Sequence, residues 1–556
     1  MAGGLMQLVA YGQQDTYLTG RPQISFWKVT YRRYTNFAVE SIEQTFNGQA
    51  DFGRRVTCVV ARNGDLAYRT YLQVTLPEIN QDMANTTGEG VYARWLDYIG
   101  EHMVSQVEVE VGGQRIDRQY GDWMHIWNQL TGTSEHYERG YASMVGNTTQ
   151  LTYVVEPIFE DVDGPCNSDN VPTQVCAPRN ALPETTLYVP LTFWYCRNPG
   201  LALPLIALQY HEVRINVDLR PIDECLWAMS DIGTPTAKKV SRAYSQSLVA
   251  ASLYVDYAFL DTDERRKMAQ NPHEYLIEQL QFTGDESIGS SSNKIKLNFN
   301  HPCKELVWVV QPDTNVDYCS SLEPGQQLCN LLGAQPFNYT DALDVLPNSV
   351  RAFGGAGTLS KDEFIDENLF VDAGAWGLSG SIGDSVGAWG SNGSNGSMGS
   401  NGSMGNSVDV GNSSNLPNNT QFSASSLSDA GVFVLAETAL NLHCWGQNPV
   451  VTAKLQLNGQ DRFSEREGTY FDQVQPYQHH TRTPDTGINV YSFALRPEEH
   501  QPCGTCNMSR IDNGTLQLVV SNATVAGTST AKVRVYATNY NVFRVMSGMG
   551  GLAYSN

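Results

Sequence analysis

The chain has 556 residues, 41% of them hydrophobic, and a formal net charge of −22 at pH 7. Its length predicts about two to four domains, each with a full core. The negative charge argues against nucleic acid as the main partner, because a protein that binds a duplex needs a basic face to displace counterions. Plentiful Gly, Tyr, Asn, Ser and Thr, with little helical periodicity, favour many short strands joined by turns.

The N-terminus, the lengths of the apolar runs and the cysteines indicate in which cellular compartment the chain folds. The N-terminus has no basic segment leading into an apolar run, and no stretch approaches about 18 uninterrupted apolar residues, so we expect neither a secretory signal nor a membrane span. The eleven cysteines follow no repeating framework. Cys166 with Cys176 and Cys319 with Cys329 could pair within loops, but a reducing compartment with mostly free thiols is the simpler hypothesis.

The first half of the chain is predicted to be an arm followed by a β-domain. Residues 1–26 are rich in Gly and Gln, which is typical of an extended arm. The first domain is predicted over 27–220, with a short helix between Trp95 and Val104 and an irregular connection over 129–185. Turn residues over 221–242 favour a linker at this point.

The second domain is predicted over 243–556, with the strand at Ala251–Leu260 as its first strand and a charged helix at Asp261–Ala269 after it. Periodicity is then lost over 312–446, and the centre of that stretch, 377–420, is a Gly/Ser/Asn repeat that cannot form a packed core. We expect a surface loop inserted between two strands, since loop-closure free energy rises by only about 0.6 kcal/mol per doubling of length.

Two segments far apart in the chain share one strand-and-turn pattern. Val107–Val111 alternates valine with polar residues and leads into a Gly-Gly-Gln turn. Val451–Leu457 alternates in the same way, with its odd-numbered residues predicted on one face, and leads into Asn458-Gly459. Further alternating strands follow at Val213–Leu219 and Leu516–Val520. The pattern predicts two copies of one β-unit.

Several fragments near the C-terminus imitate catalytic motifs. Asp485-Thr486-Gly487 matches an aspartic-protease loop, but no second copy exists to supply the partner carboxylate. The spacing from Cys503 to Cys506 matches a redox pair, but the motif lies among strand-like segments, so a local disulfide or plain packing is favoured. His479 and His480 are expected in a strand, where neighbours point to opposite faces and make poor metal co-ligands.

Two further features receive structural interpretations. Glu465 and Glu467 would share a strand face like a glycosidase pair, but solvent-facing charges are the preferred interpretation. Sequons for N-glycosylation gather in the predicted loop, although a Gly/Ser/Asn repeat also creates them by chance. The candidate glycosylation sites are Asn392, Asn395, Asn401, Asn412 and Asn418.

The chain resembles the major capsid proteins of large icosahedral double-stranded DNA viruses, most closely those of algal viruses. Similar blocks occur in order from end to end: Met1–Ile42, Val107–Asp117, Gly200–Val213, His273–Gly284, Leu297–Pro302, Leu457–Gln478, Tyr491–Pro502 and Asn539–Tyr554. The resemblance does not cover 129–185 or 312–446. Cys503 replaces the small residue expected in the family motif, which suggests a private disulfide or a free thiol.

The resemblance implies an all-β fold of two tandem eight-stranded antiparallel jelly-roll sandwiches with long surface loops and few short helices. It implies a homotrimer with a pseudo-hexagonal outline that tiles an icosahedral shell, with the 312–446 insertion as an outward tower and the N-terminal arm beneath. The residues predicted to pack the arm and the base are Phe26, Trp27, Tyr31, Phe37, Met549 and Tyr554.

The implied partners are neighbouring capsomers and minor capsid proteins, with an internal viral membrane close by, covalent glycans on the loop, and no direct nucleic acid. The implied location is the outer shell of the virion, after assembly in the host cytoplasm. No enzymatic activity, cofactor or metal is expected. Two alternatives remain: a less abundant capsid paralogue with a specialised loop, and a carbohydrate-active β-sandwich, either a lectin or a glycoside hydrolase.

Overall fold

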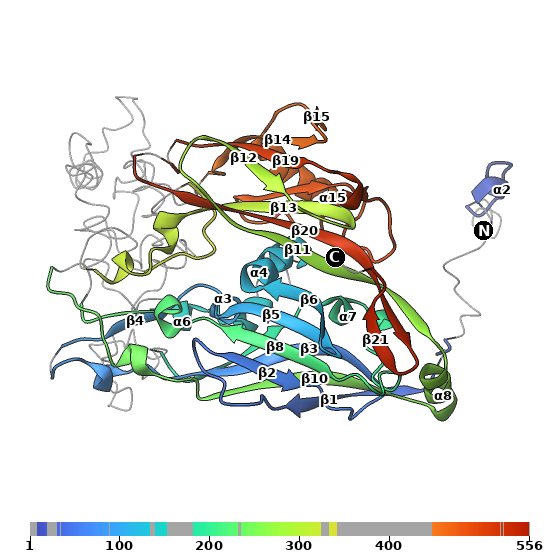
Figure 1. Cartoon of the computed structure of the whole chain (residues 1–556), viewed down its shortest axis with the longest axis horizontal. Helices are drawn as coiled ribbons and strands as arrows, with labels where there is room; N and C mark the ends of the chain where they lie inside the picture. The colour runs from blue at the N-terminus through green and yellow to red at the C-terminus, as the bar shows by residue number, and fades with distance from the viewer. Residues whose placement is uncertain are drawn as a thin grey trace.

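The computed structural model describes residues 8–18, 20, 31–33, 35–87, 89–133, 140–152, 182–231, 235–323, 333–341, 447–522, 524–525 and 527–554. These residues form two β-sandwiches, one above the other in the view of Figure 1, with many of their strands running roughly along the long axis of the molecule. The helices in the described part of the chain are short: α2 Asp15–Leu18, α3 Ile99–His102, α4 Gly121–Thr131, α5 Ala142–Met144, α6 Thr149–Thr152, α7 Trp194–Arg197, α8 Thr262–Gln270 and α15 Gln475–His479. Among them, none has the length and apolar character to cross a membrane.

The first sandwich consists of two antiparallel sheets. One has the order β1-β10-β3-β7, with bounds Phe37–Gln44, Ala250–Leu260, Leu66–Leu76 and Thr185–Pro190. The other has the order β2-β8-β5-β6, with bounds Arg55–Val59, Val213–Leu219, Val104–Val111 and Gln114–Tyr120. A separate ladder pairs β4 (Tyr92–Trp95) with β9 (Leu226–Met229).

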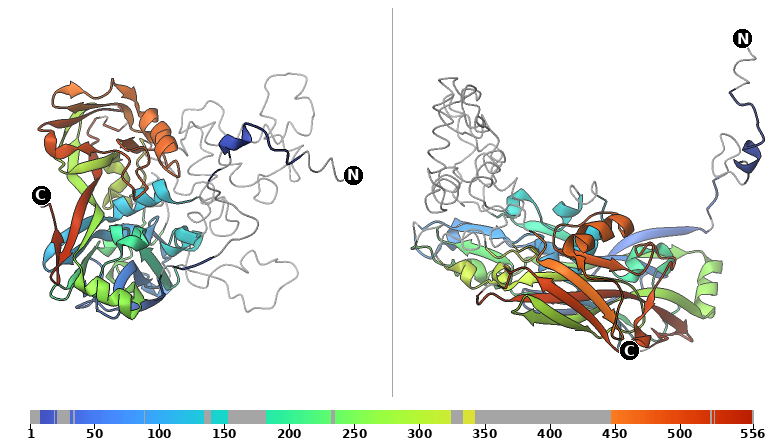
Figure 2. Two further views of the ribbon diagram at one scale, coloured as in Figure 1. Left: turned by 90° about the vertical axis from the view of Figure 1, so that its right-hand side faces the viewer. Right: turned by 90° about the horizontal axis from the view of Figure 1, so that it is seen from above.

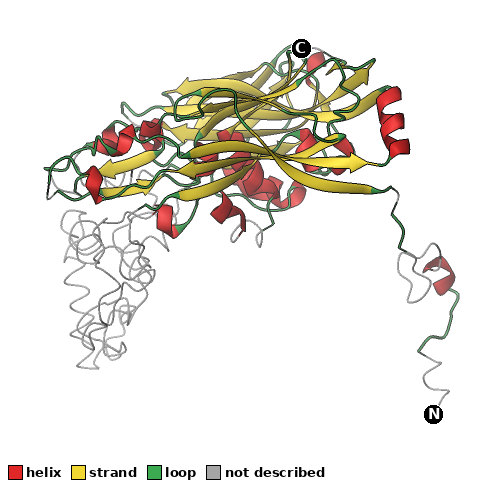
Figure 3. Ribbon diagram, turned by 90° about the horizontal axis from the view of Figure 1, so that it is seen from below, coloured by secondary structure: helices red, strands yellow, loops and turns green. Residues whose placement is uncertain are grey.

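The second sandwich repeats this arrangement. One sheet has the order β11-β20-β13-β17, with bounds His273–Ile288, Ala531–Met546, Pro302–Pro312 and Ile488–Ser492, and β18 (Cys506–Asn507) and β21 (Met549–Leu552) add to it. The other has the order β12-β19-β14-β15, with bounds Ser292–Leu297, Gly514–Val520, Val450–Leu457 and Gln460–Asp461, and β16 (Arg466–Glu467) pairs with β14. Figure 3 shows how strands dominate both halves.

The duplicated β-unit predicted from the sequence is confirmed by the strand order. The β5–β6 hairpin turns at Gly112 and Gly113, and the β14–β15 hairpin turns at Asn458 and Gly459; all four residues have positive φ. Each hairpin follows the same neighbour in its sheet, β8 in the first sandwich and β19 in the second. The two halves therefore share one topology, the jelly roll.

The strand Ala250–Leu260 corrects the predicted domain division. It was expected to open the second domain, but β10 pairs with β1 and β3 and is an inner strand of the first sandwich. The stretch 221–242 is not a free linker either, because β9 lies within it and the side chains of Leu226 and Trp227 are buried. Local patterns did not predict this pairing, because the partners of β10 in β1 and β3 lie between 175 and 223 residues earlier in the chain.

Two smaller expectations also change. Val451 is exposed because the β14–β19 register shifts between Val450 and Thr452, so Val450 takes the core position. The helix predicted between Trp95 and Val104 shortens to α3, whereas the charged helix predicted at Asp261–Ala269 is confirmed as α8, which Asp261 caps through a bond from the Thr262 amide.

The predicted insertion lies between β13 and β14, but its beginning is packed. Ala334 and Tyr339 are buried, and Tyr339 packs with Val307 and Val309 of the second sandwich. The two described ends then meet: the Asp341 amide donates to the Gln447 carbonyl at 3.0 Å, and the Gln447 amide donates to Asp341 Oδ1 at 2.9 Å. We call this pair the neck. The low-complexity stretch 377–420 lies outside the described residues.

Candidate functional site: the junction between the sandwiches and the exposed surfaces

Helix α4 joins the two sandwiches through an apolar face. Trp123, Ile126, Trp127 and Leu130 follow the i, i+3, i+4, i+7 spacing of one helical stripe. They pack on the side of the β11-β20-β13-β17 sheet that faces away from its own core, against Val307, Val309, Ile488, Val490 and Tyr536. Figure 2 shows α4 between the two halves. This stripe was present in the sequence, and counting helical spacing from Trp123 to Leu130 would have found it.

A buried ion pair reinforces this contact. Asp122, at the start of α4, lies 2.7 Å from the Arg534 guanidinium of β20 and 3.6 Å from that of Arg220. Burial alone would raise the pKa of Asp122, but the two guanidinium groups outweigh it and hold that pKa below its usual value. The carboxylate therefore stays ionised inside the junction and fixes β20 to α4.

A second charged bridge lies further along the junction. Glu278 of β11 accepts from Arg197 of α7 at 3.0 Å and lies 2.8 Å from Lys304 of β13. The guanidinium of Arg197 also lies 4.0 Å from the ring centre of Trp127, in α4. Charges from both sandwiches thus meet around one carboxylate, which fixes their relative position.

Asp117 adds a titratable contact between the sandwiches. Its carboxylate, on β6, accepts from the Leu280 amide of β11 at 3.1 Å. Burial is the largest influence and raises the pKa of Asp117 to about 7, against the lowering effect of its hydrogen bonds.

The protease-like tripeptide is part of this junction. Gln129 of α4 donates to Asp485 Oδ2 at 2.8 Å and accepts from the Asp485 amide at 3.3 Å. Gly487 has a φ of +100°, and a Cβ there would lie 2.1 Å from the Tyr339 carbonyl oxygen. The tripeptide therefore forms a tight turn that is hydrogen-bonded to α4.

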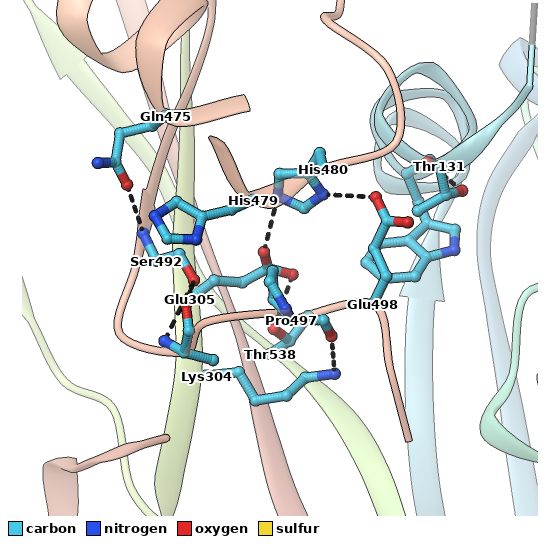
Figure 4. A network of polar contacts seen from close by, with 12 residues as sticks. Thr131, Lys304, Glu305, Gln475, His479, His480, Ser492, Pro497, Glu498 and Thr538 are labelled. Atoms are coloured by element: carbon cyan, nitrogen blue, oxygen red, sulfur yellow. Dashed lines mark hydrogen bonds and ion pairs between the residues drawn. The ribbon is translucent and has the colours of Figure 1, made fainter. Parts of the chain in front are cut away.

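The histidine pair corrects a second prediction. His479 is the last residue of α15 and His480 is the C-cap that follows it, so neither lies in a strand, and the His480 side chain is fully buried. Its Nε2 lies 3.0 Å from Glu305, and its Nδ1 donates to Glu498 at 2.9 Å (Figure 4). Burial alone would lower the pKa of His480, but the two carboxylates raise it to about 9, so the ring is charged at neutral pH.

Two neighbouring polar side chains also find hydrogen-bond partners in or beside this cluster. Thr538 donates to Glu305 at 3.0 Å, and the Lys304 ammonium donates to the Pro497 carbonyl at 2.6 Å (Figure 4). The cluster holds β13, β20, α15 and the loop after β17 together. Among the described residues, no group of three or more His, Cys, Asp or Glu is arranged to bind a metal.

The remaining motif residues have ordinary structural positions. Cys506 lies in β18 rather than at the start of a helix, and Cys503 and Cys506 are both free thiols. The Cys503 thiol donates to the Arg496 carbonyl at 3.2 Å, so the loop closes without a disulfide. Glu465 accepts from Thr452 at 2.5 Å, and both Glu465 and Glu467 are exposed, as expected.

Most residues predicted to pack the arm and base are exposed in the single chain. Tyr31 is 91% exposed, and Phe37, Met549 and Tyr554 are each more than half exposed. Any packing role for them therefore requires a partner outside the described residues of this chain. Phe26, Trp27 and the five candidate glycosylation asparagines lie outside the described residues.

One exposed surface combines several aromatic side chains. We define the outer face as the side of the β1-β10-β3-β7 sheet that points away from its core, and it carries Phe37, Val39, Tyr71, Tyr188 and Tyr254. Tyr71 stacks on Tyr254 with ring centres 5.3 Å apart and meets Tyr188 edge-on at 6.1 Å. No helix in the described part of the chain covers this face in the way that α4 covers the β11-β20-β13-β17 sheet.

Two family models together match most of the chain. The model described as "Large eukaryotic DNA virus major capsid protein" matches residues 264–551, and "Major capsid protein N-terminus" matches residues 25–261. They meet where β10 ends, which agrees with the corrected domain division.

Curated relatives and solved structures agree with these models. The chain is 70% identical to the "Major capsid protein" of Chrysochromulina ericina virus and 71% identical to that of Phaeocystis pouchetii virus, with full coverage of both chains. The structure "PBCV-1 virus capsid, quasi-atomic model" is similar with a TM-score of 0.57 and 32% identity, over 96% of this chain and 100% of that one. Such relatives are structural proteins, which sets aside the carbohydrate-active alternative. The chain therefore belongs to the family of large eukaryotic DNA virus major capsid proteins and is a structural component of a viral capsid.

Proposed function

We propose that the chain works as a homotrimer whose six sandwiches give a pseudo-hexagonal capsomer in the outer shell of the virion. The observation that carries this proposal is the pair of sandwiches with one strand order, held together by the buried junction around α4. A threefold assembly of such chains presents six near-equivalent sides to its neighbours. The junction makes each chain a rigid unit of this assembly.

The surroundings of the capsomer follow from its charge and its exposed ends. A chain of net charge −22 is suited to contact other capsid proteins rather than the genome. The exposed Met549 and Tyr554, at the C-terminal end, are proposed to contact minor capsid proteins at the base, close to an internal viral membrane. Assembly is proposed to take place in the host cytoplasm.

The insertion is proposed to form an outward tower on the second sandwich. The neck supports this, because its two ends are bonded to each other at one site on the sandwich surface. The asparagines Asn392, Asn395, Asn401, Asn412 and Asn418 remain candidate glycan carriers, which mass spectrometry of virion-derived peptides from 377–420 would test.

The trimer is tested by light scattering coupled to size-exclusion chromatography on the purified full chain. A measured mass of three chains supports the proposal. A chain that remains a monomer at a protein concentration of about 10 µM, at which only weak complexes dissociate, contradicts it. Image reconstruction of virions tests the capsomer outline and shows whether this chain is the abundant copy or a paralogue at special positions.

A further inference from the structure

Two cysteines lie opposite each other in the second sandwich. Cys303 of β13 and Cys506 of β18 are register partners in an antiparallel ladder. Directly opposed residues of such a ladder place their side chains on the same face of the sheet, and both cysteines pack against the core of the second sandwich. Both are free thiols, so the fold holds two oxidisable groups side by side.

The backbone spacing at this pair suits a disulfide. The Met508 amide donates to the His301 carbonyl at 3.0 Å, which places these two residues at a hydrogen-bonded position of the ladder. Hydrogen-bonded and non-hydrogen-bonded positions alternate along antiparallel strands, so Cys303 and Cys506, two residues further along, form a hydrogen-bonded pair as well. The Cα atoms of such a pair lie about 5.5 Å apart. Disulfides most often span about 5.5–6 Å between Cα atoms.

The Cys303 thiol can lose its proton without leaving its present acceptors unsatisfied. It donates to the carbonyls of Asn300 and His301 at 3.6 and 3.7 Å. The Asn300 carbonyl also accepts from Gln281 Nε2 at 2.6 Å. The His301 carbonyl also accepts from the Met508 amide. Both carbonyls therefore keep a donor when the thiol is oxidised.

A third cysteine of this region is held elsewhere. The Cys503 sulfur accepts from the Arg496 amide at 3.1 Å and donates to the Arg496 carbonyl at 3.2 Å. Cys506 packs against the core of the second sandwich together with Cys303. The geometry therefore favours the cross-strand pair over the Cys503–Cys506 pair that the sequence spacing suggests.

We propose that Cys303 and Cys506 are a redox-active pair that closes into a cross-strand disulfide when the protein is exposed to a small-molecule disulfide such as oxidised glutathione. The partly exposed Cys506 sulfur attacks one sulfur of the oxidant, the S–S bond of the oxidant breaks, and one glutathione thiol leaves. The buried Cys303 sulfur then attacks the Cys506 sulfur of this mixed disulfide, and the second glutathione thiol leaves. The protein thiols give up two electrons and two protons, which reduce the oxidant to its two thiols.

The surroundings of the pair make this reaction slow at neutral pH. Burial raises the pKa of Cys303 to about 12, and the neighbouring Cys506 adds to the rise. Burial also raises the pKa of Cys506, against the lowering effect of Arg462. Because the thiolate is the attacking form, we expect the chain to fold with both thiols reduced and the pair to oxidise on prolonged contact with the oxidant.

The disulfide fixes a loop that carries part of the buried cluster in Figure 4. Residues 493–505 connect β17 to β18, and both strands pair with β13. This loop supplies Glu498 to His480. Strand β18 is two residues long, so a covalent bond at Cys506 reinforces a short ladder at the end of the loop. The site lies within one chain, so the inference stands whether or not the chain forms the proposed trimer.

Mass spectrometry of the full-length protein tests the pairing. The purified chain is incubated with oxidised or with reduced glutathione, the remaining thiols are alkylated, and the peptides are analysed without reduction. We expect a peptide that joins Cys303 to Cys506 after oxidation, from chains that migrate as monomers in a denaturing gel without reductant. A bond from Cys506 to Cys503 or to another chain, a stable glutathione adduct on Cys506, or two alkylated thiols after oxidation would each overturn the inference.

Matched variants connect the bond to the loop. Cys506→Ser removes one partner, whereas the controls Cys503→Ser and Cys319→Ser remove thiols outside the pair. Oxidation should slow hydrogen exchange of residues 493–505 by roughly ten-fold in the wild type and in both controls. Cys506→Ser should show no such change and should keep the wild-type circular dichroism spectrum.

Re-reduction of the oxidised wild type provides a second comparison that needs no variant. Treatment with reduced dithiothreitol should restore the faster exchange of residues 493–505 together with the alkylation of Cys303 and Cys506. Equal slowing in Cys506→Ser, or slow exchange that persists after both thiols have been recovered, would show that the bond between them does not fix the loop.

Discussion

At the scale of the residue, His480 connects the stability of the second sandwich to pH. Its pKa is raised to about 9 in the folded chain from 6.5, so its contribution is complete below pH 6.5 and is lost as the pH rises through 9. The linkage amounts to about 3 kcal/mol at most. His480→Gln should lower the free energy of unfolding at pH 7 and flatten its decline between pH 7 and 9.

Urea unfolding at several pH values measures this effect. The matched control is His479→Gln, because His479 is adjacent but partly exposed and contacts only the Leu495 carbonyl among the bonds described. The control should keep the wild-type pH profile. A wild-type stability that does not fall between pH 7 and 9.5 would show that the His480–Glu305–Glu498 cluster is not ionised as described.

Gly487 is a second residue on which the junction depends. A methyl group there would meet the Tyr339 carbonyl at 2.1 Å, and the φ of +100° is unfavourable for any other residue. Gly487→Ala should lower the melting temperature clearly more than Gly113→Ala, which has a φ of +83° but open space around the added atom. The positive φ costs about 1–2 kcal/mol in either variant. The difference between their melting temperatures in thermal unfolding therefore measures the effect of the contact with Tyr339. Equal losses would contradict the role of the close approach.

At the scale of the element, α4 makes the two sandwiches into one unit. Trp123 is fully buried between them, and removing its ring leaves a cavity that costs about 3–5 kcal/mol. Trp123→Ala should therefore loosen the sandwiches from each other and increase the rate of limited proteolysis at the connection around α8, which is already exposed. The matched control, Trp308→Ala, removes a buried ring from the core of the second sandwich and should not favour cleavage between the two halves.

The neck predicts that the insertion is separable from the fold. Because Asp341 and Gln447 are already bonded, replacing 342–446 by a short Gly-Ser turn should leave both sandwiches intact. Shortening the loop should raise stability slightly, by about 0.6 kcal/mol per halving of its length. Thermal unfolding and size-exclusion chromatography measure this, and a truncated chain that aggregates would show that the sandwich needs the insertion.

At the scale of the whole molecule, the charge of −22 per chain opposes assembly at low ionic strength. Raising the salt from 0.01 to 0.15 M shortens the screening length from about 30 to about 8 Å. Association of purified capsomers, followed by sedimentation velocity, should therefore strengthen over this range. Weaker association in the higher salt would instead indicate complementary charges between neighbouring capsomers.

The sequence was informative where structure is local. Alternation and turn residues predicted the duplicated hairpins at Gly112 and Asn458, and a run of charged residues predicted the helix α8. The assignment of β10 and the burial of His480 were not predictable in this way, because both depend on partners far away in the chain. The spacing of its apolar residues could predict the buried face of α4, but it could not predict the sheet on which that face packs.

The place of β20 in its sheet has a consequence for how the protein is made. This strand lies between β11 and β13 in the sheet, yet it follows both of them in the chain and is therefore synthesised after them. The second sandwich therefore cannot complete its main sheet until β20 has been synthesised, and β11 and β13 remain without their common neighbour until then. A chain that stops before residue 531 lacks the inner strand of this sheet and the Arg534 contact to Asp122. We therefore expect such a truncated chain to leave the second sandwich unfinished and the junction around α4 without one of its ion pairs.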